Sequence, residues 1–339
     1  MTAIGKRRTL NKEKIRQIRL AISRGNFPFP ALLSLFLVSA FTATKSPEFL
    51  TFDNFVQISD QASVTIILVC GLTFVILMGS IDLSVQGVMA ASSMTTSLLV
   101  ANDRNANSWG FWSIPAGMAV GALIGLIAGL AVTRLRIPSF LVTIATWNIG
   151  LGLAYILFGN TSQPSVKDEK MLALGLDTFL GFSKASWVAF GVIVACMWLQ
   201  TRTKFGRYAY VIGGSEEIAK LSGIDVKRYR TLAMILAGSL SGLAGSLIVA
   251  KSGIGAVQAG EGQLFLGIAA VVIGGTLLSG GRGGILHSVV GVYIMITISV
   301  AMILLDVSDY YQQIVQGAVV LIVVSSTAWR LRRPLRTVV

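Results

Sequence analysis

The sequence predicts an all-α polytopic membrane protein of about ten transmembrane helices, with an internal pseudo-repeat and glycine-rich breaks. Hydrophobic residues make up 54% of the 339-residue chain and charged residues 13%, and the mean hydropathy is +0.74. Apolar runs repeatedly approach the roughly 20 residues that cross a bilayer. The net charge of +13 does not indicate nucleic-acid binding, because the basic residues flank apolar runs instead of sharing a face with aromatic residues.

Ten apolar segments follow one another, and we expect each of them to cross the membrane. They lie at 29–44, 55–78, 84–101, 111–133, 138–158, 185–200, 231–250, 264–278, 285–305 and 311–329. Residues 1–26 are basic but lack the apolar region and cleavage site of a signal peptide, so we expect a retained cytoplasmic tail. Residues 27–330 then form a single transmembrane domain, and residues 331–339 form a second basic tail.

The distribution of charge predicts that both termini lie in the cytoplasm. With ten spans and an internal N-terminus, 22 of the 28 lysines and arginines fall on the cytoplasmic side, while ten of the fifteen acids fall outside. Cytoplasmic loops of membrane proteins carry such an excess of basic residues. We therefore expect the basic loops and both tails to lie on the cytoplasmic side of the membrane.

A polar island at 201–230 interrupts the apolar segments and contains the signals of a short helix. Ser215 is a suitable N-cap, Glu216 and Glu217 occupy the first turn where the helix dipole favours anions, and Gly223 is a stop signal. Charges bracket the apolar positions of this helix, so we expect it to lie on the membrane surface or against a partner. A solvated loop with an incidental helical turn is the alternative.

Two glycine-containing breaks interrupt apolar runs, at 79–87 and at 279–284. Paired breaks of this kind point to an internal repeat around a transport route, and we expect the two breaks to lie near each other. Gly280 and Gly281 lie in the second break. The alternative interpretation of this break is a tight turn between two spans. Asp82 lies in the first break, where it either serves the route or caps the following helix.

Polar residues within the apolar segments are sparse, and three of them are candidates for lining a route. Trp147, Asn148 and Thr276 combine a stacking surface with neutral hydrogen-bonding groups, which suits a polyhydroxylated solute. Hydrogen bonding between helices is the alternative role for each of them.

Several motifs, taken together, resemble the permease subunits of ATP-binding-cassette importers for monosaccharides, the ribose, xylose and galactose type. They occur in family order and spacing over most of residues 50–325. The matching segments are Gly79–Val85, Ile137–Thr143, Phe205–Tyr208, Gly213–Glu217, Leu221–Ile224, Gly260–Gly262, Ile268–Thr276 and Ser279–Gly283.

This resemblance implies a subunit that spans the bacterial cytoplasmic (inner) membrane and pairs with a second permease, as a homodimer or a heterodimer. Two cytoplasmic ATPase subunits would bind the ATP, so that this chain needs no cofactor or metal, and a periplasmic or lipid-anchored binding protein would deliver the solute. The solute would be a monosaccharide, or alternatively a polyol, a nucleoside or a sugar-derived signalling molecule. The helix of the polar island would couple the subunits through Gly213, Gly214, Ser215, Glu216, Glu217, Leu221, Ser222 and Gly223.

The sequence departs from the family pattern at a few positions. Ser80 and Gln86 stand where glycines are usual, and Ser215 replaces an asparagine. The segment Gln263–Leu266 lacks two acids that are common in the family. Their loss raises the expectation that this subunit pairs with a different, complementary permease.

Two rival classes fit the sequence less well. An ion-coupled secondary transporter predicts paired carboxylates or a cation cage at the bilayer midplane, and Asp82 alone comes near. A membrane-embedded enzyme needs a nucleophile with a base or a set of metal ligands, but the chain has one histidine and two separated cysteines. The sequence also lacks a G-x-x-x-x-G-K-[ST] motif, so the energy for transport is expected from another subunit.

Overall fold

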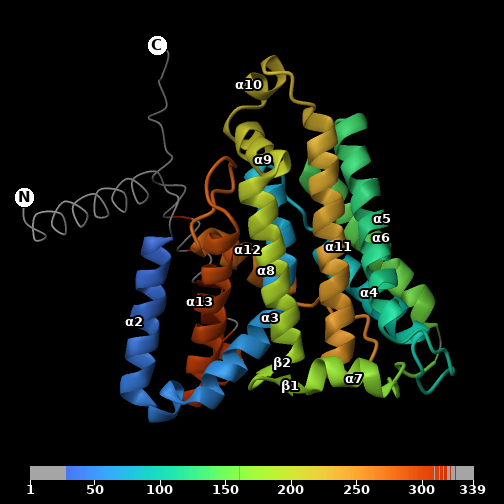
Figure 1. Cartoon of the computed structure of the whole chain (residues 1–339), viewed down its shortest axis with the longest axis vertical. Helices are drawn as coiled ribbons and strands as arrows, with labels where there is room; N and C mark the ends of the chain where they lie inside the picture. The colour runs from blue at the N-terminus through green and yellow to red at the C-terminus, as the bar shows by residue number, and fades with distance from the viewer. Residues whose placement is uncertain are drawn as a thin grey trace, which may run out of the picture.

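The computed structural model describes residues 28–159 and 161–308, together with 310–312, 314, 315, 317, 318, 321 and 325. The expected tails at 1–26 and 331–339 lie outside the described residues, as does much of the expected span at 311–329. Helices dominate the described part, and a two-stranded hairpin joins them at one end (Figure 1). The elements are α2 (Phe29–Lys45), η1 (Pro47–Leu50), α3 (Phe52–Leu77), α4 (Val85–Leu99), η2 (Gly110–Trp112), α5 (Ser113–Arg134), α6 (Ser139–Phe158), α7 (Glu169–Leu176), β1 (Thr178–Phe179), β2 (Phe182–Ser183), α8 (Lys184–Arg202), α9 (Lys204–Gly214), α10 (Glu216–Leu221), α11 (Val226–Ser252), α12 (Gln263–Ile273) and α13 (Ile285–Leu304).

Six helical segments in the described residues are long and apolar enough to cross a membrane, and the chain is polytopic as expected. They are α3, α5 with η2, α6, α8, α11 and α13. The expectation of a full span at 264–278 is wrong, because α12 has 11 residues and reaches only about 16 Å at 1.5 Å per residue. Gly274 ends this helix ahead of the second break. The segment at 84–101 is likewise shortened to the 15 residues of α4.

Helix α3 runs through the middle of the bundle and is buried along almost all of its length from Ile58 onward. Its apolar residues cover all sides of the helix, which is typical of a helix surrounded by other helices. It packs against α8, α11, α12 and α13, and Figure 1 shows it between them. Gly71 lies so close to α11 that an added Cβ would stand 2.7 Å from the Ala237 Cα. The core of the protein therefore forms around α3 and α11.

Helices α5 and α11 pack closely over most of their length. Four glycines at every fourth position of α5 face α11, where the partner glycines lie at Gly238 and Gly242. Small residues at this spacing bring two backbones together inside a membrane, where packing rather than hydrophobicity drives association. The glycines of α5 are Gly117, Gly121, Gly125 and Gly129.

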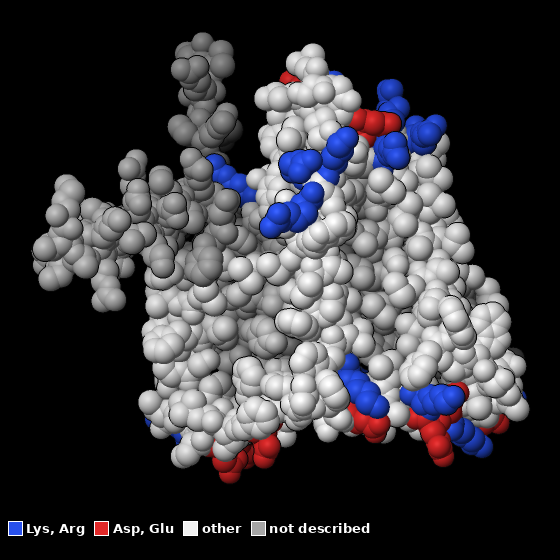
Figure 2. All heavy atoms as spheres, in the orientation of Figure 1, with Lys and Arg blue, Asp and Glu red and all other residues white. Residues whose placement is uncertain are grey.

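The bundle has two polar ends separated by an apolar belt. We call the end that carries α9, α10 and the α5–α6 connection the α10 end, and the end that carries α7 and the β-hairpin the α7 end (Figure 1). Figure 2 shows basic residues gathered at the α10 end, mixed charges at the α7 end, and an uncharged surface between them on this face. This division agrees with the charge distribution expected for a membrane-spanning bundle.

Candidate coupling site

Helix α10 forms where the capping signals predict it. The Ser215 hydroxyl accepts a hydrogen bond from the Ile218 N–H at 3.3 Å, and Gly223 beyond the helix adopts a left-handed φ of 75°. Ala219 is buried, whereas Ile218 and Leu221 are 60% and 89% exposed. Because residues three apart share a helix face, α10 presents an apolar pair outward from the α10 end.

An ion-pair network joins α10 to the start of α11. The Glu216 carboxylate contacts Lys220 at 2.6 Å and Arg230 at 2.8 Å. The hydrogen bond from Lys220 and the nearby positive charges hold the pKa of Glu216 below its usual value, against the opposing effect of partial burial. Arg230 also donates to the Met78 carbonyl at 3.4 Å. Helix α10 is thereby linked through Arg230 to the end of α3, next to the first glycine break.

The end of α9 contacts both glycine breaks through backbone atoms. The Gly281 N–H donates to the Leu77 carbonyl at 2.9 Å, and a Cβ on Gly213 would overlap that carbonyl oxygen and lie 2.5 Å from the Gly281 nitrogen. A Cβ on Gly280 would lie 2.8 Å from the Gly79 nitrogen. The two breaks therefore contact each other. Gly213 and Gly214, at the end of α9, lie against them. We call this cluster of Gly79, Gly213, Gly280 and Gly281 the glycine junction.

A hydrogen-bond network ties α8 and α9 to the second break. The Tyr210 hydroxyl donates to the Gly283 carbonyl at 2.7 Å and accepts from the Gln200 side chain at 2.8 Å. Gln200 in turn accepts from the Ile285 N–H at 2.7 Å. Thr276 is buried in the same region, where its hydroxyl accepts from the Gly284 N–H at 3.1 Å. Thr276 thus holds the backbone of the break in place.

Asp82 lies buried in the first break, and its carboxylate faces the start of α4. One carboxylate oxygen accepts from the Ser84 N–H at 2.8 Å and from the Ser84 hydroxyl at 2.6 Å. These contacts satisfy a backbone donor next to the first turn of α4. The break itself covers only the residues before Val85, so Gln86 and Gly87, which we placed in it, belong to α4.

Trp147 and Asn148 are neighbours on α6 but point to different surroundings. Trp147 is partly buried, and its indole N–H has no hydrogen-bond partner among the described residues. Its backbone lies directly against Gly87 of α4. The Asn148 side chain is exposed and donates to the Ile144 carbonyl of its own helix at 3.0 Å. The structure does not bring Asn148 and Thr276 to one site.

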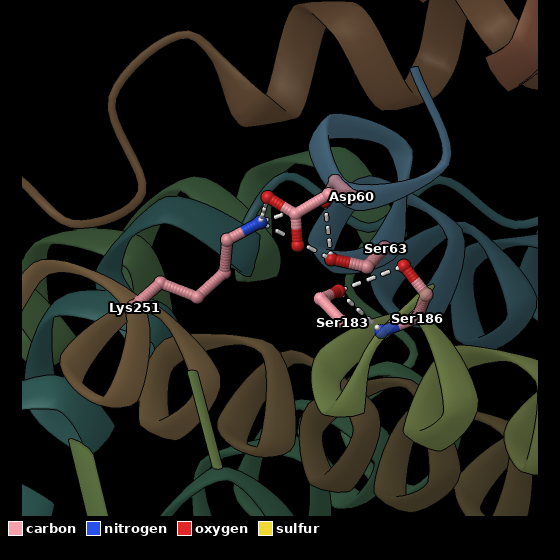
Figure 3. Close-up of polar contacts among 5 residues, drawn as sticks. All are labelled: Asp60, Ser63, Ser183, Ser186 and Lys251. Atoms are coloured by element: carbon pink, nitrogen blue, oxygen red, sulfur yellow. Dashed lines mark hydrogen bonds and ion pairs between the residues drawn. The ribbon is translucent and has the colours of Figure 1, made fainter. Parts of the chain in front are cut away.

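At the α7 end, a second ion pair joins α3 and α11 (Figure 3). The Lys251 ammonium lies 2.9 Å from an Asp60 carboxylate oxygen and donates to the Asp60 carbonyl at 2.6 Å. The other Asp60 carboxylate oxygen is buried and has no hydrogen-bond partner in the described part of the chain. Ser63 lies beside the pair, and the Ser183 and Ser186 hydroxyls lie 2.9 Å apart at the start of α8.

Sequence reasoning did not single out Arg230, Tyr210 or the Asp60–Lys251 pair. Arg230 is one of several basic residues in the polar island, and nothing local distinguishes it from its neighbours. A tyrosine near a membrane boundary is common in any span. The one available signal was Asp60 itself, which is a carboxylate within a long apolar helix and therefore needs a partner.

Comparison with known proteins assigns the family. Residues 54–324 match the family described as "Branched-chain amino acid transport system / permease component". The chain belongs to this permease family. It is 33% identical over 297 residues to the ribose import permease protein RbsC of Escherichia coli K12, which covers 87% of this chain and 91% of that protein. It is 35% identical over 293 residues to RbsC of Bacillus subtilis 168, with 86% and 90% covered.

A third relative, the L-arabinose transport system permease protein AraH of Escherichia coli K12, is 32% identical over 275 residues, with 81% of this chain and 82% of that protein covered. No solved structure matches the permease. The resemblance stated from the motifs is confirmed, and the chain is a transport subunit rather than an ATPase.

Proposed function

We propose that the permease moves a monosaccharide across the bacterial inner membrane, with both termini in the cytoplasm. Among the monosaccharides, a pentose is the first candidate. The relatives that match more than four fifths of the chain carry ribose and L-arabinose in their names, which supports a pentose. We expect this permease to bind an ATPase at the α10 end, a binding protein at the α7 end and a second permease.

The observation that carries the coupling proposal is the contact of the α9 end, which leads directly into α10, with both glycine breaks. The exposed pair Ile218 and Leu221 offers a small apolar surface to an ATPase, while Gly213 and Arg230 connect the same short segment to the ends of α3 and of the second break. A displacement of α10 would therefore be transmitted to the two interrupted segments by backbone contact. Interrupted segments of this kind often line the route in transporters.

For the route itself, we propose Trp147 and Asn148 as solute contacts, with Asp82, Thr276, Gly280 and Gly281 shaping the break region. The indole N–H of Trp147 is buried and has no partner among the described residues, so it would reach a solute hydroxyl only after a local opening of the bundle. Asn148 places a polar amide on an exposed apolar stretch of α6, which favours a polar surface over lipid at that position. Weak neutral contacts suit a solute that must leave again.

The solute proposal is tested by uptake into proteoliposomes that contain the permease with its ATPase and binding protein. We expect ATP-dependent uptake of ribose or arabinose and no competition by leucine. Uptake of leucine without competition by either pentose would overturn the sugar assignment.

Asn148→Ala should lower uptake while ATPase stimulation by the loaded binding protein remains. Thr276→Val should destabilise the break as well, because it removes the acceptor for the Gly284 N–H.

The coupling proposal is tested with Ile218→Asp/Leu221→Asp. We expect this variant to insert normally but to lose co-purification of the ATPase, since a charged pair cannot enter an apolar groove without loss of its hydration. The control Ile218→Val/Leu221→Met keeps the face apolar and should retain both binding and uptake. Full ATPase binding by the aspartate variant would remove α10 as the docking helix.

A further inference from the structure

A cavity of 720 Å³ lies at the α10 end, between the first break, the α5–α6 connection, α10 and the start of α11. Its lining includes four cations from three separate elements, and we call it the basic cavity. The cations are Arg136, Lys220, Lys227 and Arg230. Side chains that repel one another gather in this way where a bound anion offsets the repulsion.

The cavity keeps positive charge that no acid in the described residues neutralises. Glu216 is the acid in its lining, and that carboxylate is already shared between Lys220 and Arg230. Arg136 and Lys227 have no ion-pair partner in the described part of the chain. Arginine and lysine side chains that converge from different elements suit a phosphate group, which offers several acceptor oxygens at once.

The rim of the cavity is apolar as well as basic. Residues 134–137, at the end of α5 and in the α5–α6 connection, alternate basic and apolar residues, and Phe140 and Leu141 follow at the start of α6. Leu135 is 70% exposed, and Phe140 and Leu141 are 45% and 50% exposed. A segment with cations and exposed apolar side chains side by side fits the boundary between headgroups and acyl chains. A free inorganic anion would leave these apolar side chains uncovered.

We propose that the basic cavity binds the phosphodiester headgroup of an anionic membrane lipid, whose acyl chains cover Leu135, Phe140 and Leu141. The proposal rests on the orientation given above, in which the α10 end faces the cytoplasmic leaflet. Basic pockets on that side of membrane proteins recognise anionic headgroups. Because the cavity borders α10 and the first break, the lipid would lie against the coupling helix and link membrane composition to coupling.

The test uses the full-length permease without its partners, so that its result does not depend on solute or ATPase. Thermal unfolding is followed in nanodiscs of phosphatidylcholine with increasing phosphatidylglycerol, and separately with inorganic phosphate. We expect phosphatidylglycerol to raise the unfolding midpoint. Arg136→Gln/Lys227→Gln should weaken the apparent affinity by about twenty-five-fold, at about a factor of five for each basic residue. The control Lys204→Gln/Arg207→Gln removes two exposed cations outside the cavity and should respond as the wild type.

Three results would overturn the proposal. The first is an equal response of the wild type and the cavity variant to phosphatidylglycerol. The second is full stabilisation by inorganic phosphate alone, which would assign the cavity to a soluble anion. The third comes from a separate co-purification with the ATPase: loss of ATPase binding in the cavity variant, with its lipid response unchanged, would assign the cavity to an acidic segment of the ATPase.

Discussion

The same two helices, α3 and α11, are joined at both ends of the bundle by a cation of α11, but the two joints differ. At the α7 end, Lys251 contacts Asp60 directly, and no further element intervenes in that pair. At the α10 end, Arg230 reaches the Met78 carbonyl and at the same time binds Glu216 of the coupling helix. The first joint holds two helices together, whereas the second also includes the short helix that we propose to contact the ATPase.

This difference assigns separate roles to the two ends. The joint at the α7 end contributes to stability, because the Lys251 ammonium and the partly buried Asp60 carboxylate offset each other's charge there. The joint at the α10 end consists of an ion pair of similar length and exposure, a 3.4 Å contact from Arg230 to the Met78 carbonyl and backbone contacts at the glycine junction. This joint connects α10 to the first break, so we expect these two segments to move together during transport. The predictions below separate stability from coupling.

The largest effect is expected at the glycine junction. Gly213→Ala places a Cβ against the Leu77 carbonyl and the Gly281 nitrogen, and backbone atoms cannot rotate away as a side chain can. Overpacking of this kind costs about 1–3 kcal/mol or more, so uptake should fall about tenfold or more. The control Gly214→Ala meets no atom within 4 Å and should transport normally. Equal uptake by the two variants would remove the junction from the account.

A large loss of stability is expected at the α7 end. Lys251→Met leaves the Asp60 carboxylate partly buried without its cation, and we expect a loss of about 2 kcal/mol in the free energy of unfolding, below the roughly 3–5 kcal/mol of a fully buried pair. The matched control is Lys184→Met, whose partner Asp177 is 54% exposed, and it should lose less than about 0.5 kcal/mol. Denaturant titration in detergent measures both. Similar losses in the two variants would show that burial does not distinguish the pairs.

A smaller effect on coupling is expected at Tyr210. Tyr210→Phe removes the hydrogen bonds to the Gly283 carbonyl and to Gln200, which are worth about 1 kcal/mol each. The ratio of solute molecules transported to ATP molecules hydrolysed should fall about fivefold, while binding of the ATPase to the permease stays unchanged. Tyr208→Phe is the control, because the Tyr208 ring packs on Tyr229 with centroids 4.9 Å apart and the substitution keeps that contact. A normal ratio in Tyr210→Phe would separate α9 from the second break.

The smallest effect is a pH dependence of α10. Since the folded protein holds the pKa of Glu216 below its usual 4.5, the ion pairs stabilise α10 fully above that pH, and this contribution is lost as the pH falls through the lowered pKa. Hydrogen exchange of the α10 amides should therefore be slower in the wild type than in Glu216→Gln at pH 7. The difference should vanish under acidic conditions. A difference that persists unchanged in acid would assign the effect to something other than the carboxylate charge.

The local features of the coupling helix could be predicted from sequence, but its connections could not. Ser215 and Gly223 mark the ends of α10 within nine residues, so neighbouring residues suffice to predict it. The contact between Arg230 and Met78 joins residues 152 apart, and that between Lys251 and Asp60 joins residues 191 apart. No periodicity in the sequence encodes such distances. The length of α12 was overestimated because apolar residues continue past Gly274, where the helix ends.

The central claim is that α10 and the first break move as one unit when ATP binds. The measurement uses pairs of spin labels in the assembled transporter and reports the distance between them. One label lies in the hairpin at the α7 end, at Leu180→Cys. The other lies either in α10, at Leu221→Cys, or in the first break, at Ile81→Cys. All three side chains are exposed. The account predicts that both distances to residue 180 change together on ATP binding, while the distance between residues 81 and 221 stays constant. A change at residue 221 with none at residue 81 would contradict it.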